Sequence, residues 1–472
     1  MSAEPDRESA DPRVSPLTDD VLSVDELSQY ASCVAYSPSS DDLESANARH
    51  PQKQDGQQTN KQTWAARKTV IGGFFALMAS FGWLNSMSIF LQCYRDDEQI
   101  ATSETKIMWI TAMQIFLVLV SGVFVGPLFD YYGPRGLLHV GTVLQVFGLS
   151  MPLMGTHIPQ IIMCQGILAP IGSACVFHTC LCSVSTWFDN SQLAIALGIT
   201  MSGTNIGGIV FPFVLRKLIA DQALYIVIIS CAVLVYAFMI IPSVLVRSNA
   251  THTGWRRPDI SRFREPFTDH KFLILGCGSF IAYFGIYCPT IYIVQDAIFN
   301  GLDKDQAKYL VSMSSASGVL GRIIPAVIGD RLDDRDKLRH HSIYFVAIMS
   351  TAASIFAVWI VAHTHGQMIA FTVLYGFLSG AVMTMVPVCC AEISKSEVSM
   401  RIGLLFGLIS FSALAGVPIS GVVLGDGKTR EQWAMMKIYC GVLICAGGII
   451  VGAGRSFARA AQKRKRTELS SD

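Results

Sequence analysis

The amino-acid sequence predicts an all-α membrane protein with twelve transmembrane helices in two six-helix halves. Of its 472 residues, 51% are hydrophobic and only 15% are charged, whereas charged residues make up roughly 25% of a typical soluble domain. Apolar stretches of about 18 residues or more, long enough to cross the hydrocarbon of a bilayer, recur about twelve times. The expected spans are residues 70–91, 107–129, 137–155, 160–186, 193–215, 223–246, 272–295, 309–329, 342–362, 367–391, 402–424 and 437–454.

The segments outside these spans give the expected domain organisation. Residues 1–66 are rich in Ser, Asp, Glu and Gln and contain few large apolar groups, so we expect a disordered N-terminal tail. The two six-helix halves are expected at 67–246 and 272–454, joined by a basic linker at 247–271. A basic C-terminal tail follows at 455–472.

The distribution of Lys and Arg predicts the orientation in the membrane. An even number of spans places both termini on one side. Outside the N-terminal tail, the segments on that side hold about 21 Lys and Arg residues and the opposite loops about 9. Because cytoplasmic segments carry the excess of Lys and Arg, we expect both termini to be cytoplasmic. The plasma membrane is the default location.

The two halves carry similar interruptions at corresponding places. The fifth span contains Gly207, Gly208 and Pro212, and the eleventh contains Gly416 and Pro418. Paired spans broken by Gly and Pro are typical of secondary transporters built from repeats, which bind substrate near the midplane between the repeats. The sequence therefore predicts a transporter.

A polar motif follows the second span. It reads Gly126-Pro-Leu-Phe-Asp130-Tyr-Tyr-Gly133-Pro-Arg135, and a looser copy with Asp330 follows the eighth span. Glycines allow a tight turn, and an Asp can cap a helix start or pair with an Arg in one conformational state. We expect a conformational latch formed by Gly126, Asp130, Gly133, Arg135 and Asp330. The alternative is an ordinary turn with membrane-flanking charges.

The motif resembles the loop signature of the major facilitator superfamily. Several further segments resemble the fungal branch of its monocarboxylate porter family, over roughly residues 64–455. These segments are Gly72-Gly-Phe, Phe81-Gly-Trp-Leu-Asn-Ser, Ser185-Thr-Trp-Phe188, Pro266-Phe-x-Asp269, Phe284-Gly-x-Tyr287-x-Pro289 and Ser317-Gly-x-x-Gly-Arg322. The resemblance implies the major facilitator fold and transport by alternating access.

Arg322 is the main candidate for binding substrate. It lies eight residues before Asp330, about 12 Å along a helix, and an unpaired charge at that depth costs roughly 2.5 to 3.5 kcal/mol. The small residues Ser315, Gly318 and Gly321 could leave room for a ligand carboxylate to reach the guanidinium. In the family that the chain resembles, the equivalent Arg binds the substrate carboxylate. The alternatives are snorkelling toward the interface and a structural pair with Glu392.

Two departures from that family bear on the substrate. Proton-linked members carry a Lys where this chain has Asn85 and an Asp where it has Gly318. Both missing groups belong to the family's proposed proton and substrate relay. Their loss argues against lactate-type proton symport and favours a bulkier or less acidic organic substrate.

Three further residues are weaker candidates for the substrate site. His178 could belong to a proton relay because imidazole titrates near neutrality, or it could be a packed, hydrogen-bonded residue. Asn85 and Tyr287 lie where helices of this fold usually face the central cavity. Either could instead hold helices together through hydrogen bonds.

The expected function is secondary active or facilitative transport of a small organic anion or metabolite, with efflux of an organic acid or secondary metabolite favoured. Proton-linked import of short monocarboxylates is the alternative, so protons remain a candidate partner. A transporter-like nutrient sensor is the alternative from another class, and only the acidic N-terminal tail supports it.

Other function classes find no support in the sequence. The net charge of +1 and the lack of a basic-aromatic motif argue against nucleic acid. No HExxH, GxSxG or paired-carboxylate pattern indicates an enzyme. No Cys and His spacing indicates a metal, and no cofactor is expected. The bilayer itself is the other expected partner, and the run Lys463-Arg-Lys-Arg466 would be attracted to anionic lipid.

Overall fold

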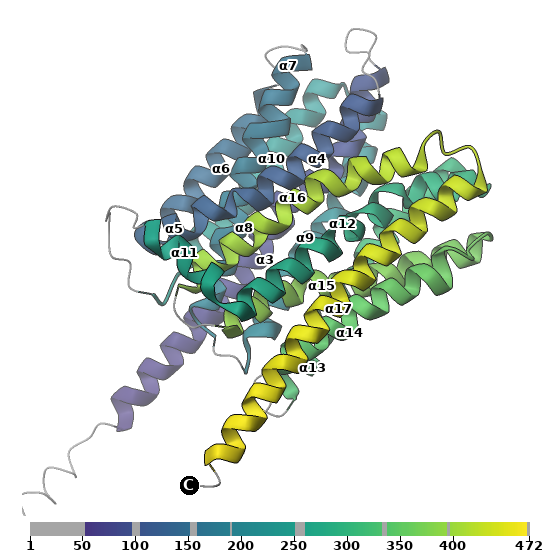
Figure 1. Cartoon of the computed structure of the whole chain (residues 1–472). Coiled ribbons are helices and arrows are strands. Elements are labelled where there is room, and N and C mark those ends of the chain that lie inside the picture. Colours follow the sequence, from purple (N-terminus) through teal and green to yellow (C-terminus); the bar gives the residue numbers. More distant parts are fainter. Residues whose placement is uncertain are drawn as a thin grey trace, which may run out of the picture. The chain divides into compact units, whose positions relative to one another are not determined.

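A computed structural model of the chain describes residues 52–96, 104–151, 158–188, 191–250, 260–332, 338–393 and 397–469. Residues Gln62–Asp472 form one compact unit, to which the architecture below refers. In chain order its helices are α3 Gln52–Asp96, α4 Glu104–Val120, α5 Gly122–Tyr132, α6 Pro134–Ser150, α7 Ile158–Ile161, η2 Ile162–Leu168, α8 Ala169–Ser185, α9 Leu193–Asp221, α10 Leu224–Leu245, α11 Ile260–Thr268, α12 His270–Phe299, α13 Lys304–Arg331, α14 Arg339–Ser354, η3 Ile355–Trp359, α15 His365–Ile393, α16 Val398–Leu424 and α17 Arg430–Leu469 (Figure 1).

The prediction of an all-α fold with twelve membrane spans is confirmed. Eleven described segments are long and apolar enough to cross a membrane. The remaining span is α6, whose 17 described residues stop just before a stretch outside the described part of the chain. Three spans are composite: α4 continues into α5, α7 into η2 and α8, and α14 into η3.

The first half ends with α10 at Leu245 and the second begins with α12 at His270, while the short helix α11 lies in the connection. Residues 1–51 of the expected disordered tail lie outside the described residues. Residues 52–66 are helical, because α3 begins at Gln52. Gln, Lys and Ala, which dominate this segment, lose little side-chain freedom in a helix.

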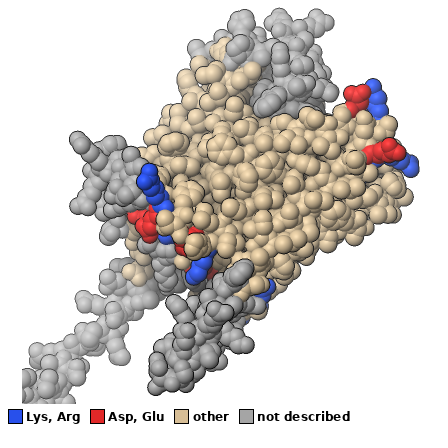
Figure 2. Space-filling model, in the orientation of Figure 1, with Lys and Arg blue, Asp and Glu red and all other residues tan. Residues whose placement is uncertain are grey.

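Charged side chains gather at two ends of the visible face, with a wide uncharged band between them (Figure 2). Large apolar side chains are exposed on the spans, among them Phe213 at 72% and Val422 at 81%. Exposed apolar surface of this kind suits a hydrocarbon solvent. We call the end that carries the connection from α10 to α12 the linker face. Because successive spans alternate in direction, the described helix ends at the α5–α6, α8–α9, α13–α14 and α15–α16 connections belong to the same face.

The two halves meet along two pairs of elements. The helix α9 of the first half packs against α13 of the second, and α16 of the second half packs against α4 and α5 of the first. Glycine allows this close approach: a Cβ atom on Gly126 of α5 would lie only 2.6 Å from the carbonyl oxygen of Ser399 on α16. Small residues at such contacts are typical of helix packing in membranes.

Candidate functional site

A buried arginine on α13 lies at the centre of the candidate site. Arg322 is 5% exposed. Its Nη2 lies 3.6 Å from the sulfur of Met383 on α15, and a thioether is a weak acceptor. Its Nε and Nη1 have no hydrogen-bond partner among the described residues. The guanidinium is therefore a buried cation without a compensating anion in the described part of the protein.

Neither alternative interpretation of Arg322 agrees with this geometry. A snorkelling side chain would be exposed at an interface, and this one is buried. Glu392 is not its partner, because the two carboxylate oxygens of Glu392 contact His340 and His341. An uncompensated buried charge costs several kcal/mol. Such a group is retained where a ligand supplies the opposite charge.

Two tyrosines of α12 belong to the surroundings of Arg322. Tyr283 is 2% exposed and Tyr287 is half-buried. Their ring centroids lie 5.7 Å apart. Both phenol groups interact electrostatically with the guanidinium, and the hydroxyl of Tyr283 has no hydrogen-bond partner among the described residues. The site therefore offers one cation and at least one hydroxyl that the protein itself leaves unpaired.

The first half of the chain reaches α13 through α9. A Cβ atom on Gly198 would lie 2.6 Å from the carbonyl oxygen of Arg322, so the two backbones are in close contact. One turn before Arg322, the amide of Asn205 lies against Gly318 and fills the space that a side chain there would need. Gly318 therefore does not leave room for a ligand, contrary to our expectation. Gly321 does not either, because it packs against the Phe377 carbonyl of α15.

Asn85 lies on the same side of α9 but is not in contact with Arg322. Its amide nitrogen lies 3.4 Å from the carbonyl oxygen of Thr204. A Cβ atom on Gly208 would lie 2.9 Å from this nitrogen and 3.3 Å from the hydroxyl of Ser315 on α13. Asn85 and Ser315 thus approach each other across Gly208, about two helical turns from Arg322.

His178 on α8 has a structural contact instead of a contact with Arg322. It is fully buried, and its Nε2 donates to the carbonyl oxygen of Val118 at 3.1 Å. The helix pair α4 and α5 is interrupted near this carbonyl, at Ser121. The ring lies against Gly122 and packs 5.6 Å from the ring of Phe406 on α16. His178 thus packs at the contact between the two halves.

The residues of the expected latch fall into two groups. Gly126 and Asp330 contact the opposite half, Gly126 at Ser399 and Asp330 through Oδ2, which accepts from the backbone N–H of Ile195 at 2.8 Å. Gly133 forms the turn between α5 and α6 with φ of +73°. Gly126 is not a turn residue as we expected, because it lies inside α5.

The other two latch residues, Asp130 and Arg135, lie near the linker face of the first half. Asp130 interacts electrostatically with Cys182, a buried residue that lies within hydrogen-bonding reach of Ser399. Asp130 is thus close to the start of α16. Arg135 is exposed near the start of α6.

Sequence reasoning missed a cluster of ionisable side chains around Asp330. His340 Nε2 lies 3.1 Å from Asp330 Oδ1, and His340 Nδ1 is in hydrogen-bond contact with Glu392 Oε1. His341 Nδ1 lies 3.2 Å from Glu392 Oε2. The pair His340-His341 directly after a charged connection was the available signal. Within the described ranges, no group of His, Cys, Asp and Glu is arranged to hold a metal ion.

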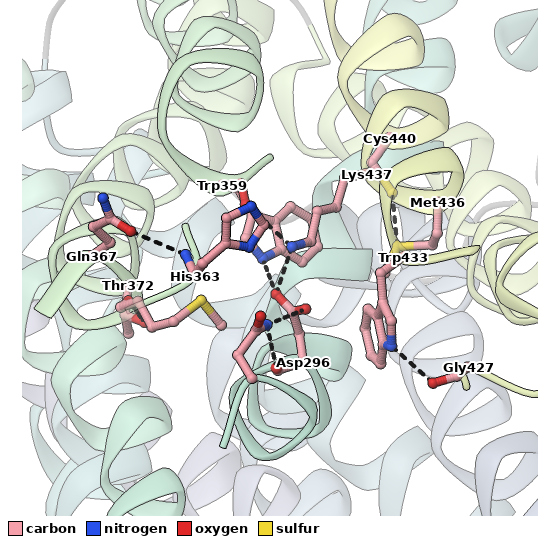
Figure 3. A network of polar contacts seen from close by, with 12 residues as sticks. Asp296, Trp359, His363, Gln367, Thr372, Gly427, Trp433, Met436, Lys437 and Cys440 are labelled. Carbon is pink, nitrogen blue, oxygen red and sulfur yellow. Dashed lines mark hydrogen bonds and ion pairs between the residues drawn. The ribbon is translucent and has the colours of Figure 1, made fainter. Parts of the chain in front are cut away.

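A second missed feature is a buried ion pair near the face opposite the linker face. Lys437 Nζ of α17 lies 2.9 Å from Asp296 Oδ2 of α12, and their side chains are 4% and 0% exposed. The same carboxylate accepts from Trp359 Nε1 at 2.8 Å and from Asn300 Nδ2 at 3.1 Å. Figure 3 shows these side chains pointing toward one another. Lys437 is the first residue of the twelfth expected span, but α17 begins earlier, at Arg430, so that Lys437 lies inside the helix.

Comparisons with known proteins agree with this architecture. A family model described as Major Facilitator Superfamily matches residues 69–335 and 275–470. The similar solved structures include FucP in the outward conformation, with a TM-score of 0.64 and 13% identity over 82% of this chain and 98% of that one. A variant of the E. coli fucose:proton symporter FucP gives a TM-score of 0.63 at 12% identity, with the same coverage. At such identities the likeness concerns the fold alone.

Curated relatives are similar over most of the chain. "MFS-type transporter 1" of Ophiocordyceps sp. is 31% identical over 396 residues, which is 83% of this chain and 85% of that protein. The "Fujikurins efflux protein" of Gibberella fujikuroi is 30% identical over 393 residues, 83% of this chain and 82% of that protein. The "Agnestins efflux protein AgnL12" of Paecilomyces divaricatus is 27% identical over 81% of this chain and 85% of that protein.

Proposed function

The chain belongs to the major facilitator superfamily, and on that premise we propose that it exports an organic anion by alternating access, with Arg322 binding the anion. It is a multi-pass membrane transporter. The finer assignment rests on the buried guanidinium, which lacks a carboxylate partner among the described residues. An anionic substrate would supply the charge that the protein leaves out, and a planar guanidinium can bind a carboxylate through two hydrogen bonds.

The remaining polar groups near Arg322 are neutral. Tyr283 and Tyr287 are phenols, Asn205 carries an amide one helical turn away, and the amide of Asn85 lies about two turns away. A substrate with one delocalised negative charge on an apolar skeleton with hydroxyl groups fits this set. Tyr287 and Asn85 are proposed to contact that skeleton. The Nε2 of His178 is bonded to Val118, whereas its Nδ1 has no hydrogen-bond partner among the described residues, so Nδ1 is the atom that would act in substrate or proton binding.

Efflux is favoured over import by the relatives and by one contact. Relatives named as efflux proteins for fujikurins and agnestins cover most of the chain. The relay Asp expected of a proton-linked monocarboxylate importer would occupy the position of Gly318, and Asn205 fills that space. Membership of the monocarboxylate porter family thus remains a prediction for this chain.

The orientation in the membrane is part of the proposal. The excess of Lys and Arg on the side of the linker face favours a cytoplasmic location for that face and for both termini, in the plasma membrane. The contacts of Gly126 with Ser399 and of Asp330 with Ile195 then hold the protein closed toward the cytoplasm. Gly126, Asp130, Gly133, Arg135 and Asp330 would form the latch of this outward-facing state.

Transport of a bulky carboxylate tests the proposal. The full chain would be purified and reconstituted into liposomes loaded with labelled 2-naphthoate, with protein-free liposomes as the leakage control. We expect saturable, protein-dependent flux that unlabelled 2-naphthoate inhibits and 2-naphthamide, the neutral analogue of the same shape, does not. Absence of protein-dependent flux, or equal inhibition by the amide, would contradict anion transport.

A further inference from the structure

Four ionisable side chains from three helices form one buried chain of contacts near the linker face. Asp330 ends α13, His340 and His341 begin α14, and Glu392 lies near the end of α15. The side chains of His340, Asp330, Glu392 and His341 are 0%, 2%, 4% and 13% exposed. Ionisable groups this deeply buried are retained where they are paired or have a function.

The hydrogen bonds of His340 fix the number of protons in this cluster. Its Nε2 faces Asp330 Oδ1 at 3.1 Å, and its Nδ1 faces Glu392 Oε1. An ionised carboxylate only accepts hydrogen bonds, and a neutral imidazole has one N–H to donate. Both bonds therefore exist only if His340 carries two protons or if one carboxyl group is protonated. In either case the cluster holds one proton more than a neutral imidazole between two carboxylates.

The same carboxylate that binds His340 also holds the two halves of the protein together. Asp330 Oδ2 accepts from the backbone N–H of Ile195 at 2.8 Å, in the first turn of α9. The N-cap residue Gln192 makes no side-chain capping bond. A carboxylate at this position satisfies a free N–H and interacts favourably with the helix dipole. Asp330 thus caps a helix of the opposite half.

Among the described residues, the helices packed around the cluster present the following groups to it. On α14, Arg339 is buried and its Nη1 donates to the carbonyl oxygen of Leu332 at 3.0 Å. On α15, the thiol of Cys389 interacts electrostatically with Glu392. On α9, the facing group is the backbone N–H of Ile195. Among the described groups of this neighbourhood, the imidazole side chain is the type that ordinarily changes charge near neutral pH.

We propose that Asp330, His340, Glu392 and His341 form a proton-binding site, whose bound proton keeps the linker face closed and whose loss opens it. The inference rests on the proposed alternating access and does not depend on the identity of the substrate. The ligand is a proton, taken up either from the linker side as a regulator or from the opposite side as a coupling ion.

Loss of the proton acts on the contact between the halves through one atom. When His340 Nε2 gives its proton to water, its lone pair faces the ionised oxygen of Asp330. The two groups then repel, and the Asp330 carboxylate turns away from Ile195. The first turn of α9 loses its cap, and the contact between α9 and α13 weakens. Closure is therefore present at low pH and lost as pH rises.

Hydrogen–deuterium exchange of the full chain in lipid nanodiscs tests the site without any substrate. The reporter is the first turn of α9, residues 193–198, after correction for the intrinsic pH dependence of exchange. In the wild type we expect protection of this turn to fall by up to about fivefold between pH 6 and pH 9, the effect of losing a helix cap. His340→Gln, which has one donor and one acceptor at every pH, should give low protection at all pH values. His340→Arg, which always donates to both carboxylates, should give high protection throughout.

The control is His139→Gln, a substitution of an exposed histidine on α6, which should keep the wild-type pH profile. Glu392→Gln provides a second variant if His340→Gln does not fold, and it should also flatten the profile. A pH-independent wild type, or a His340→Gln protein with the wild-type profile, would overturn the proposal. Neither result would bear on anion binding by Arg322.

Two measurements in liposomes that contain a trapped pH-sensitive dye then distinguish a proton that acts as a coupling ion from one that acts as a regulator. Proton movement that accompanies 2-naphthoate flux and is lost in His340→Gln would identify a coupling ion. A flux rate set by pH on the linker side, without proton movement, would identify a regulator. A flux independent of pH on both sides would overturn the proton site.

Discussion

The two contacts between the halves are copies of one arrangement with different chemistry. In the contact of α9 with α13, Gly198 packs on the backbone of Arg322, and Asp330 lies at the start of α9. In the contact of α16 with α5, Gly403 packs on the backbone of Gly122. Gly122 precedes Asp130 by eight residues, as Arg322 precedes Asp330. The repeat in the sequence therefore reproduces a backbone contact, and not only a motif.

The side chains at the two copies differ. Where the second half has the buried guanidinium of Arg322, the first half has Gly122, and the ring of His178 lies against it. Asp330 is linked to His340 and Glu392, while Asp130 lies near the thiol of Cys182. The buried guanidinium and the contacts between imidazole and carboxylates thus belong to the copy in the second half. The difference locates the proposed chemistry in the second half.

The buried ion pair of Lys437 with Asp296 lies within the second half and serves as a reference. Breaking it has the largest expected effect on stability. Lys437→Met leaves Asp296 as an unpaired buried charge, which should lower the free energy of unfolding by about 3–5 kcal/mol. The double variant Asp296→Asn/Lys437→Met should recover most of this loss. Thermal unfolding in detergent measures both changes in stability. Lys428→Met is the control, because the side chains of Lys428 and its partner Asp426 are 79% and 77% exposed. Wild-type stability of Lys437→Met would contradict the buried pair.

Substituting the contact glycines tests whether the two contacts are equivalent. A Cβ atom on Gly126 or Gly198 would lie 2.6 Å from a carbonyl oxygen of the opposite half. Gly126→Val and Gly198→Val should each destabilise the closed linker face by about 1–3 kcal/mol, roughly tenfold in population. Hydrogen exchange at the starts of α9 and α16 measures the effect. Gly136→Val is the control, because no atom lies within 4 Å of its Cβ position. An effect of substituting only one of the two glycines would show that the two contacts are not equivalent.

Removing the cap from α9 tests the electrostatic part of one contact. Asp330→Ala leaves the N–H of Ile195 without its acceptor, a loss of about 1 kcal/mol for a helix cap. We expect protection of the first turn of α9 to fall about fivefold, with a much smaller change at the start of α16. Asp426→Ala, a change at a 77% exposed side chain, should have no effect. Equal changes at both helix starts would show that the cap is not specific to α9.

Hydropathy and motif spacing predicted the fold and part of the site. Twelve spans follow from composition, because a bilayer demands long apolar helices. The depth of Arg322 in the eighth span indicated that it does not lie at an interface. For Asp330 we expected a helix cap or a pair with an Arg, and the structure places it at the start of α9 and beside His340. These features are local in sequence or repeat within it.

The unpredicted features depend on which helices become neighbours. His340 and Glu392 are distant in sequence and meet only because α14 packs on α15. The amide of Asn205 fills the space beside Gly318 because α9 packs on α13. The burial of Lys437 was not expected, because its helix begins earlier than hydropathy indicates. A single sequence contains no signal for such pairings.

Equilibrium binding of labelled 2-naphthoate to the purified chain tests the central claim most directly. We expect saturable binding to the wild type and a loss of affinity of about 100-fold in Arg322→Gln, since removing one partner of a buried charge pair costs about 3 kcal/mol or more. Arg216→Gln, at an exposed position on α9, should bind like the wild type. Unchanged affinity in a folded Arg322→Gln protein would contradict the assignment of Arg322 as the anion-binding group.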